Sequence, residues 1–352
     1  MIFLLFLLLM PSFISAYDTS AKSTCLIDAN SDRIIYKDNY NHTQSVASIS
    51  KIMTAILAIE SGKLEDTVII GNEIDKAYGS GIYIKKGEEI KLIDLVYGLM
   101  LRSGNDAALA ISNYISKDNF INMMNEKAKE LNLTKTVFRN PSGLDEEDGG
   151  NISSACDIAK LMQYCMKNKI FREITGTKKH KVKTNLNYYS WTNKNKLLNN
   201  YKYTIGGKTG FTEIAKRTLV TAAKKNNTTL IAVTLNDGSD FKDHENLYKE
   251  AFKEYKSYKI IKKGYIDIPD EEFYSNRYFY VKEEFYYLLK EFETKKIKIK
   301  YELEEKYDYK DNDNIGKLYV YLDKEKIFTT DIYISIKKKK IKIKDWILDF
   351  FD

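Results

Sequence analysis

Apolar residues recur at helical spacing in several segments of the first 256 residues, and this pattern predicts most of the fold. The clearest apolar stripe lies in residues 49–61, where Ile52, Ile56 and Ile59 share one face. The same spacing predicts further helices over residues 91–101, 105–116, 119–132, 155–167 and 244–256. Strands are predicted as a hairpin over residues 24–36, and as two runs, 218–223 and 229–235, around an Asn226-Asn227 turn.

The periodicity changes near residue 258. From there apolar and polar residues alternate in short runs such as Lys296-Ile-Lys-Ile-Lys-Tyr301 and Lys317-Leu-Tyr-Val-Tyr-Leu322. Alternation with a period of two indicates half-buried strands of a small sandwich or barrel. We therefore expect a first domain over residues 17–257 and a β-rich second domain over residues 258–340.

The first 16 residues have the character of an export signal. Residues 2–9 form an apolar core that is too short to span a bilayer, and Ser15-Ala16 offers a small-residue cleavage site. The usual basic residues before the core are missing, and a buried N-terminal helix is the alternative. We expect a mature protein that starts near Tyr17 and acts at the extracytoplasmic face of the membrane or in the cell wall.

The C-terminal residues 341–352 follow a run of four lysines, Lys337 to Lys340. Trp346, Ile347, Phe350 and Phe351 stand at helical spacing there, in a stretch too short to cross a membrane. Two alternatives stay open. The segment is either a membrane-interface anchor, with the lysines attracted to anionic lipid, or a solvated strand and helix packed on its own domain.

Composition excludes several function classes. The net charge of +7 arises from 56 basic residues interleaved with 49 acidic ones, without a compact basic patch, so nucleic acid is not an expected partner. Three cysteines are too few for a disulfide framework. The histidines are scattered and no group of side chains has metal-ligand spacing, so we expect neither a metal nor another cofactor.

A first candidate for chemistry is Ser48-Ile49-Ser50-Lys51, an S-x-x-K motif at the start of the 49–61 helix. A helix N-terminus favours developing negative charge, and Lys51 lies one turn on, on the face of Ser48. A serine hydroxyl needs a neighbouring base to become a nucleophile, and lysine can serve if burial or a nearby cation such as Lys208 lowers its pKa. By itself, Ser48 would be interpreted as an ordinary helix cap.

A second candidate is Ser103-Gly104-Asn105, which interrupts two predicted helices. Such a corner is partly exposed, as functional side chains often are. Ser103 could relay a proton, and Asn105 could hold a substrate amide. Taken alone, the segment is more typical of a glycine-containing helix–helix turn with Asn105 as the cap.

A third candidate is Lys208-Thr209-Gly210, which follows Gly206-Gly207 and is expected to precede a strand. Glycines allow a substrate backbone to approach a strand edge. Lys208 and Thr209 offer a positive charge and a hydroxyl donor for a carboxylate. A flexible glycine-rich turn with a solvated lysine is the simpler alternative.

The three motifs, read as S-x-x-K, S-x-N and K-T-G in this order, form the signature of penicillin-binding proteins and active-site serine β-lactamases. A Ser/His/Asp triad lacks support, because there is no G-x-S-x-G segment. The chain resembles the serine-type D-alanyl-D-alanine carboxypeptidases, the low-molecular-mass penicillin-binding proteins of the peptidase S11 family. The resemblance covers residues 22–256 and includes the segments 47–54, 101–108, 138–144, 193–198 and 208–212.

This resemblance implies an α+β fold, in which a β-lactamase/transpeptidase-like domain, an antiparallel sheet flanked by helices, precedes a small all-β domain. It implies that Ser48 attacks the penultimate D-Ala carbonyl of a peptidoglycan stem peptide and that Lys51 takes its proton. Ser103 and Asn105 would line the opposite wall. Lys208 and Thr209 would bind the terminal carboxylate of the substrate. The backbone N–H groups of Ser48 and of Phe211, the residue after Gly210, would form the oxyanion hole. β-Lactam antibiotics would acylate Ser48.

The chain departs from the family pattern in places. After the third motif it has Ala215-Lys-Arg217 where many members have Ala-Gly, and Lys242 and His244 stand where some members carry an arginine. The residue that completes the carboxylate site is therefore left open. Ala215-Lys-Arg217 and the layout resemble the branch associated with spore cortex.

Two alternative functions are kept. A β-lactamase needs a carboxylate that activates water, but the only nearby Leu-Asn pair, Leu131-Asn132, has Ala128 where that glutamate would stand. A non-catalytic wall or spore protein that retains the fold is the second alternative, and the intact motifs argue against it.

Overall fold

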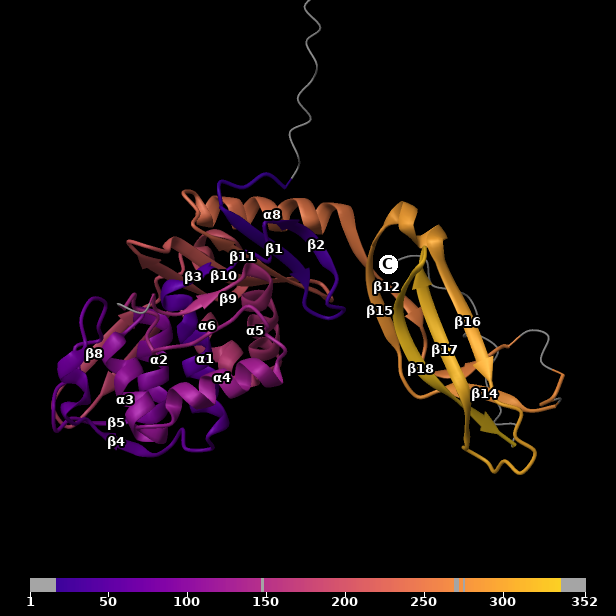
Figure 1. The fold of residues 1–352 in the computed structure, drawn as a ribbon, viewed down its shortest axis with the longest axis horizontal. Helices are drawn as coiled ribbons and strands as arrows, with labels where there is room; N and C mark the ends of the chain where they lie inside the picture. Colours follow the sequence, from indigo (N-terminus) through magenta and orange to yellow (C-terminus); the bar gives the residue numbers. More distant parts are fainter. Residues whose placement is uncertain (1–16, 147–148, 269–271, 275, 337–352) are drawn as a thin grey trace, which may run out of the picture. The chain divides into compact units, whose positions relative to one another are not determined.

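The computed structural model describes residues 17–146, 149–268, 272–274 and 276–336. The chain divides between Lys253 and Glu254 into two compact units, which are described separately. The predicted signal peptide, residues 1–16, and the predicted anchor, residues 341–352, lie outside the described residues. Figure 1 shows the course of the chain through both units.

The first unit is built on a five-stranded antiparallel sheet with the strand order β2-β1-β11-β10-β9. Its strands are β1 (Ser23–Asp28), β2 (Ile34–Asp38), β9 (Thr204–Thr212), β10 (Lys216–Lys225) and β11 (Thr228–Leu235). Asn226 has a φ of 53° and makes the tight turn between β10 and β11. Strand β9 stands at one edge of the sheet, so among the described strands β10 is its only partner there.

Helices cover both faces of this sheet. Helix α8 (Asp240–Glu254) lies on one face and six helices gather on the opposite side (Figure 1). These are α1 (Lys51–Glu60), α2 (Leu92–Arg102), α3 (Asn105–Ser116), α4 (Phe120–Glu130), α5 (Ala155–Lys167) and α6 (Lys169–Gly176). The short α7 (Leu197–Asn200) is followed by Tyr201, whose ring stacks on that of Tyr248 in α8. Helix α1 is buried from Lys51 to Ile59, and only Glu60 at its C-terminal end is exposed. Most of its buried residues are apolar, as expected of a helix that is surrounded by other elements.

Three small two-stranded sheets and two 3₁₀ turns complete the described part of the first unit. The sheets pair β3 (Gln44–Ser45) with β6 (Ile152–Ser153), β4 (Thr67–Ile69) with β5 (Glu89–Lys91), and, as a hairpin, β7 (Lys179–Lys183) with β8 (Tyr188–Thr192). The 3₁₀ turns are η1 (Ala47–Ser50) and η2 (Asn72–Lys76). The predicted α+β arrangement, an antiparallel sheet flanked by helices, is confirmed.

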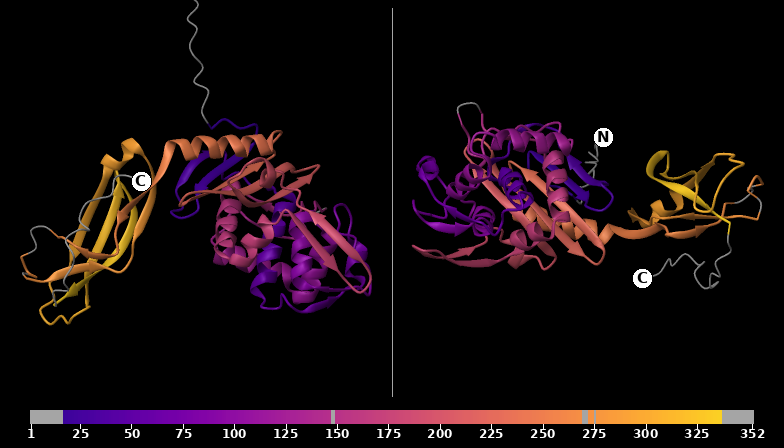
Figure 2. Two further views of the ribbon diagram at one scale, coloured as in Figure 1. Left: turned by 180° about the vertical axis from the view of Figure 1, so that it is seen from behind. Right: turned by 90° about the horizontal axis from the view of Figure 1, so that it is seen from below.

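In its described residues, the second unit is all β apart from the 3₁₀ turn η3 (Glu291–Lys296), which confirms the predicted fold class (Figure 2). Strand β12 (Tyr255–Ile261) pairs with β15 (Phe285–Lys290). A five-stranded sheet has the order β13-β14-β18-β17-β16, with β13 (Gly264–Ile266), β14 (Tyr278–Val281), β16 (Ile297–Leu303), β17 (Asn314–Leu322) and β18 (Glu325–Ser335). Ile315, Val320 and Ile332 are central in its core. Across the described ranges, no helix combines the length and the apolar character that crossing a membrane requires.

Candidate active site

Ser48 lies in the 3₁₀ turn η1, which runs directly into helix α1. The α-helix begins at Lys51, two residues later than the sequence pattern predicts, because the chain first makes this tighter turn. Ala47 has a φ of 48°, an uncommon conformation for a residue with a side chain, and the Ser50 hydroxyl donates to its carbonyl over 2.8 Å. The turn holds Ser48 half-buried at the N-terminal end of the helical segment.

The edge strand β9 passes directly beside this turn. A Cβ at Gly210 would lie 3.0 Å from the Ser48 backbone nitrogen, so only glycine allows the strand to come so close. The K-T-G motif itself lies inside β9, which the sequence pattern did not predict, and the strand expected after the motif is β10. Gly206 and Gly207 lie within the strand without breaking it. Thr175 of α6 packs where a side chain of Gly206 would be, and the Thr175 hydroxyl accepts a hydrogen bond from the Gly207 N–H at 2.9 Å.

The Lys51 side chain is completely buried and points to Ser48. Its Nζ lies 3.0 Å from the Ser48 Oγ and 2.7 Å from the Asn105 Oδ1, and it also donates to the Ser142 carbonyl. Burial, helped by the positive charge of Lys194, lowers the pKa of Lys51 to about 7, against a smaller opposing effect of Asp106. Lys51 can therefore accept a proton near neutral pH. The neighbouring cation that lowers its pKa is Lys194, whereas the sequence suggested Lys208.

The segment behind Lys51 is fixed by a network of asparagine side chains. The Asn140 Oδ1 accepts from the Gly143 N–H at 2.7 Å, and the Asn151 side chain donates to the Asn140 carbonyl at 2.9 Å. The Thr54 hydroxyl of α1 donates to the Pro141 carbonyl at 2.7 Å. These bonds hold the Ser142 carbonyl in place as the third acceptor for Lys51.

Ser103 and Lys208 meet on the other side of the site. Ser103 ends helix α2 with a φ of 64°, a strained conformation of the kind that functional sites often contain. The Lys208 Nζ donates to the Ser103 Oγ at 2.9 Å and to the Thr209 carbonyl at 2.6 Å. Burial, together with the charges of Lys51 and Lys194, lowers the pKa of Lys208 well below its usual value.

Asn105 connects Lys51 to a loop that borders the site. Its Nδ2 donates to the Tyr78 carbonyl at 2.6 Å, so both ends of its amide are engaged. Its backbone N–H donates to the Ser80 carbonyl at 2.7 Å, and the exposed Lys194 donates to the Ser80 hydroxyl at 3.0 Å. Asn105 thus positions Lys51 as well as lining the site.

Five of the predicted site residues lie in two hydrogen-bonded groups, Ser48–Lys51–Asn105 and Ser103–Lys208, and the charge of Lys51 acts on Lys208 between them. We call these five residues the serine–lysine cluster. Thr209, Gly210 and Phe211 follow Lys208 along β9, and the Phe211 side chain is exposed. Sequence reasoning missed Ser142 and Lys194. Both lie in segments that carried the family resemblance, but nothing in their spacing assigned them a function.

His244 does not extend the cluster. It is fully buried between Thr221 and Thr234, whose hydroxyls lie 2.7 Å and 3.1 Å from its ring nitrogens. Burial lowers the pKa of His244 to about 3, so the ring is neutral at physiological pH. Within the part of the chain that the structure describes, no group of three or more His, Cys, Asp or Glu side chains could hold a metal ion.

Comparison with known proteins places this geometry in a family. The model of the D-alanyl-D-alanine carboxypeptidase family, peptidase S11, matches residues 11–239, and that of the C-terminal domain of penicillin-binding protein 5 matches residues 255–340. The chain is 34% identical to the D-alanyl-D-alanine carboxypeptidase DacF of Bacillus subtilis, over 69% of this chain and 65% of that protein. It is 30% identical to DacB2 of Mycobacterium tuberculosis, over 61% of this chain and 74% of that protein.

Among solved structures, penicillin-binding protein 5 of Haemophilus influenzae superimposes with a TM-score of 0.76 at 24% identity, covering 90% of this chain and 97% of that one. This likeness establishes a common fold. Together with the sequence matches, it confirms the resemblance that the three motifs indicated. The chain belongs to the D-alanyl-D-alanine carboxypeptidase family of serine peptidases, peptidase S11.

Proposed function

We propose that the protein is a serine DD-carboxypeptidase that removes the terminal D-Ala from peptidoglycan stem pentapeptides through an acyl-enzyme on Ser48. The observation that carries this proposal is the contact of 3.0 Å between the Lys51 Nζ and the Ser48 Oγ. A nucleophile needs a base within hydrogen-bond reach whose pKa is near the working pH, and Lys51 meets both conditions.

In the acylation step, neutral Lys51 accepts the proton of the Ser48 hydroxyl. The Ser48 oxygen attacks the carbonyl of the penultimate D-Ala, and the carbonyl oxygen becomes negatively charged. The backbone N–H groups of Ser48 and Phe211 form the oxyanion hole, because Gly210 lets β9 approach the Ser48 nitrogen. Loss of the terminal D-Ala then leaves an ester on Ser48.

The departing amine needs a proton, and the contact between Ser103 and Lys208 supplies a route for it. The Ser103 hydroxyl accepts from Lys208 at 2.9 Å and is free to rotate its own proton towards the amine. Water afterwards attacks the ester carbonyl and gives its proton to the Ser103–Lys208 pair, which had lost one to the amine. The bond between the acyl carbon and the Ser48 oxygen then breaks, and the proton held by Lys51 returns to Ser48. Ser103 is therefore the proton relay in this proposal, and Lys51 is the base.

The substrate peptide would lie along the exposed edge of β9, where backbone pairing is available. Thr209 donates its hydroxyl to the terminal carboxylate, and Lys208 adds positive charge. A β-lactam carries a similar carboxylate and would acylate Ser48. A β-lactamase would also need a carboxylate that activates the water for hydrolysis of the ester. The carboxylate of Asp106, which follows Asn105, is already engaged, because it accepts hydrogen bonds from the backbone N–H groups of Ile82 and Tyr83.

These substrates set the location. Stem peptides occur outside the cytoplasmic membrane, so we infer that the protein is exported by its N-terminal segment and acts at the extracytoplasmic face of the membrane or in the wall. Peripheral membrane contact through residues 341–352 belongs to the same proposal.

The experiment is intact-mass measurement after incubation with benzylpenicillin, combined with release of D-Ala from a pentapeptide. The wild-type protein is expected to gain one penicilloyl adduct and to release D-Ala, whereas Ser48→Ala should do neither. A wild-type protein that forms no adduct and releases no D-Ala would instead favour a non-catalytic wall protein. Rapid turnover of penicillin without a persistent adduct would favour a β-lactamase.

A further inference from the structure

Lys208 and Thr209, the residues assigned so far to the carboxylate site of the proposed carboxypeptidase, do not supply a cation whose charge is permanent. Lys208 is buried, and it already donates to Ser103 and to the Thr209 carbonyl. The pKa of Lys208 is lowered well below its usual value, which weakens its positive charge. A group that binds a carboxylate over a wide pH range should remain charged, and arginine is the side chain that does.

Arg217 lies on the strand next to the K-T-G motif. In the pairing of β9 with β10, Arg217 stands opposite Phe211, and Leu219 stands opposite Thr209. Directly paired residues of antiparallel strands project from the same face of the sheet, as do residues two apart on one strand. Arg217 is therefore the diagonal neighbour of Thr209 on one face, about 7 Å away between Cβ atoms, a distance that its long side chain spans.

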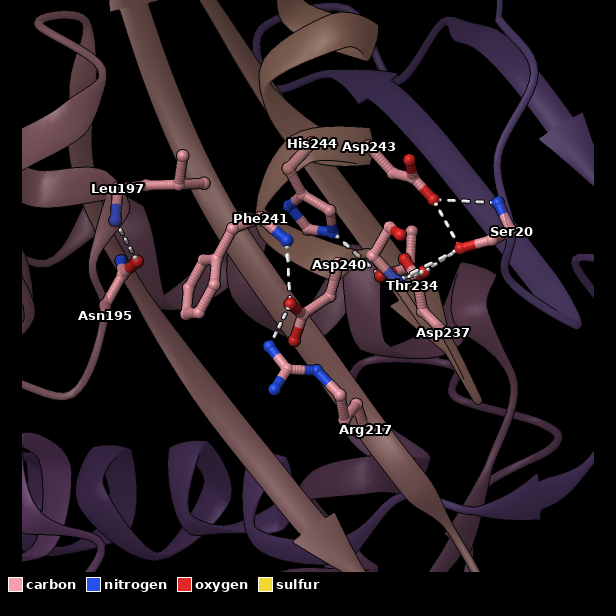
Figure 3. A network of polar contacts seen from close by, with 11 residues as sticks. Ser20, Asn195, Leu197, Arg217, Thr234, Asp237, Asp240, Phe241, Asp243 and His244 are labelled. Carbon is pink, nitrogen blue, oxygen red and sulfur yellow. Dashed lines mark hydrogen bonds and ion pairs between the residues drawn. The ribbon is translucent and has the colours of Figure 1, made fainter.

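The guanidinium group of Arg217 is held in a defined position. Its Nη2 donates to the carboxylate of Asp240, and its Cζ lies 5.6 Å from the centre of the Phe241 ring (Figure 3). The Asp240 side chain is 4% exposed, whereas that of Arg217 is 46% exposed. The buried carboxylate thus holds one side of a planar group that has five N–H donors, and the rest of the group faces solvent.

Other cations of this region are less suited to the same task. His244 is buried and neutral, as described above. Lys216 pairs with Glu213 at 3.5 Å, and it precedes Arg217 on the strand. Lys242 is exposed on the first turn of α8. Arg217 is distinguished from both lysines by its fixed position and by its ability to bind a carboxylate through two parallel hydrogen bonds.

We propose that Arg217 binds the C-terminal carboxylate of the peptide substrate together with the Thr209 hydroxyl, and that Asp240 and Phe241 hold it in position. This inference rests on the proposed carboxypeptidase function. It assigns the preference for a free C-terminal carboxylate to a residue of β10, whereas the family resemblance had left open which residue completes the carboxylate site. Arg217 would discriminate between peptides with a free and a blocked C-terminus.

The test compares two peptides that end in D-Ala-D-Ala, one with a free carboxylate and one with a carboxamide. The kcat/KM for the free acid is expected to fall about 10- to 100-fold in Arg217→Gln, as the loss of a charge-assisted contact would cause, with little change for the carboxamide. Arg217→Lys should retain part of the activity on the free acid. Lys216→Gln is the matched control, because it removes the neighbouring charge and should leave the ratio of the two substrates unchanged.

Arg217→Gln leaves the buried Asp240 without its partner, which could destabilise the protein. The double variant Arg217→Gln/Asp240→Asn removes both charges and should show the same selective loss, with thermal unfolding recorded for each variant. Equal losses on the two peptides, or no loss on the free acid, would overturn the assignment of Arg217. Failure of the proposed function would look different, since wild-type protein would then cleave neither peptide, releasing neither D-Ala nor D-alaninamide, and the assignment would fall with it.

Discussion

Gly143 lies so close to Ala47 that a Cβ on Gly143 would overlap the Ala47 carbonyl oxygen. Ala47 is the residue before Ser48, and it has a positive φ of its own. The segment 140–144 therefore has two roles. It packs against the 3₁₀ turn η1 that carries Ser48, and it presents the Ser142 carbonyl to Lys51. The position of the nucleophile depends on a glycine far away in the sequence.

We expect Gly143→Ala to disrupt the site. Gly143 has a φ of 75°, and Gly62 has a φ of 74° but no atom within 4 Å of a Cβ placed there. Gly62→Ala thus carries only the conformational cost of a left-handed residue, about 1–2 kcal/mol. Gly143→Ala carries the same cost plus the overlap with Ala47, and should lower the unfolding temperature further and slow acylation by penicillin at least tenfold. Similar acylation rates in the two variants would contradict this role of Gly143.

Much of the helical framework could be predicted from the sequence, because the relevant segments have one apolar face. Five of the six predicted helices match α1 to α5 within two or three residues at each end. Helix α8 begins at Asp240, earlier than predicted, because the polar residues of its first turn carry no apolar stripe. Helix α6 and the hairpin β7–β8 were not predicted, since the hairpin strands are short and rich in lysine and tyrosine.

The site could be predicted only as far as short motifs identify it. Ser48, Lys51, Ser103 and Lys208 stand in segments whose order is characteristic, so their proximity was expected. Ser142 acts through its backbone carbonyl, which no side-chain pattern reveals. Lys194 influences the other lysines through space, from a segment far from them in sequence, and only the folded chain shows that.

Acylation of Ser48 should depend on pH through Lys51. The pKa of Lys51 is about 7, and the lysine is a base only when it has lost its proton. The rate of acylation by a fluorescent penicillin should therefore rise with pH up to about 7 and then level off. Lys51→Met should reduce the rate by at least a thousandfold at every pH. A rate that is already constant from pH 5 upwards would show that Lys51 is not the base.

The same pKa has a consequence for stability. Between pH 7 and 10.5, Lys51 is largely neutral in the folded protein but protonated in the unfolded chain, so the unfolded state binds more protons and stability from this group rises with pH. The excess stability of Lys51→Met over wild type, measured by denaturant unfolding, should accordingly shrink as the pH is raised from 7 to 10. A difference that stays constant over this range would contradict the burial of a neutral lysine.

Cys156 should be the most reactive of the three thiols. A hydrogen bond with Cys25 is the main cause that lowers the pKa of Cys156 to about 7, whereas Cys25 and Cys165 have pKa values raised well above the usual one. The thiolate is the reactive form, so iodoacetamide at pH 7.5 should label Cys156 first, as peptide mass mapping would show. Cys25→Ala should slow this labelling and Cys165→Ala should not. First labelling at Cys165 would contradict the assignment.

Lys194 should tune the base from outside the serine–lysine cluster. Its positive charge lowers the pKa of both Lys51 and Lys208, so Lys194→Gln should raise the pKa of Lys51 and move the rise in acylation rate to higher pH. Lys194→Arg retains the charge and should leave the profile near that of wild type, and Lys196→Gln controls for the loss of a nearby exposed lysine. Because Lys194 is exposed, its effect should weaken in high salt, where the wild-type profile approaches that of Lys194→Gln. If Lys194→Gln lowers the rate by the same factor at every pH and salt concentration, Lys194 acts through its hydrogen bond to Ser80 instead of its charge.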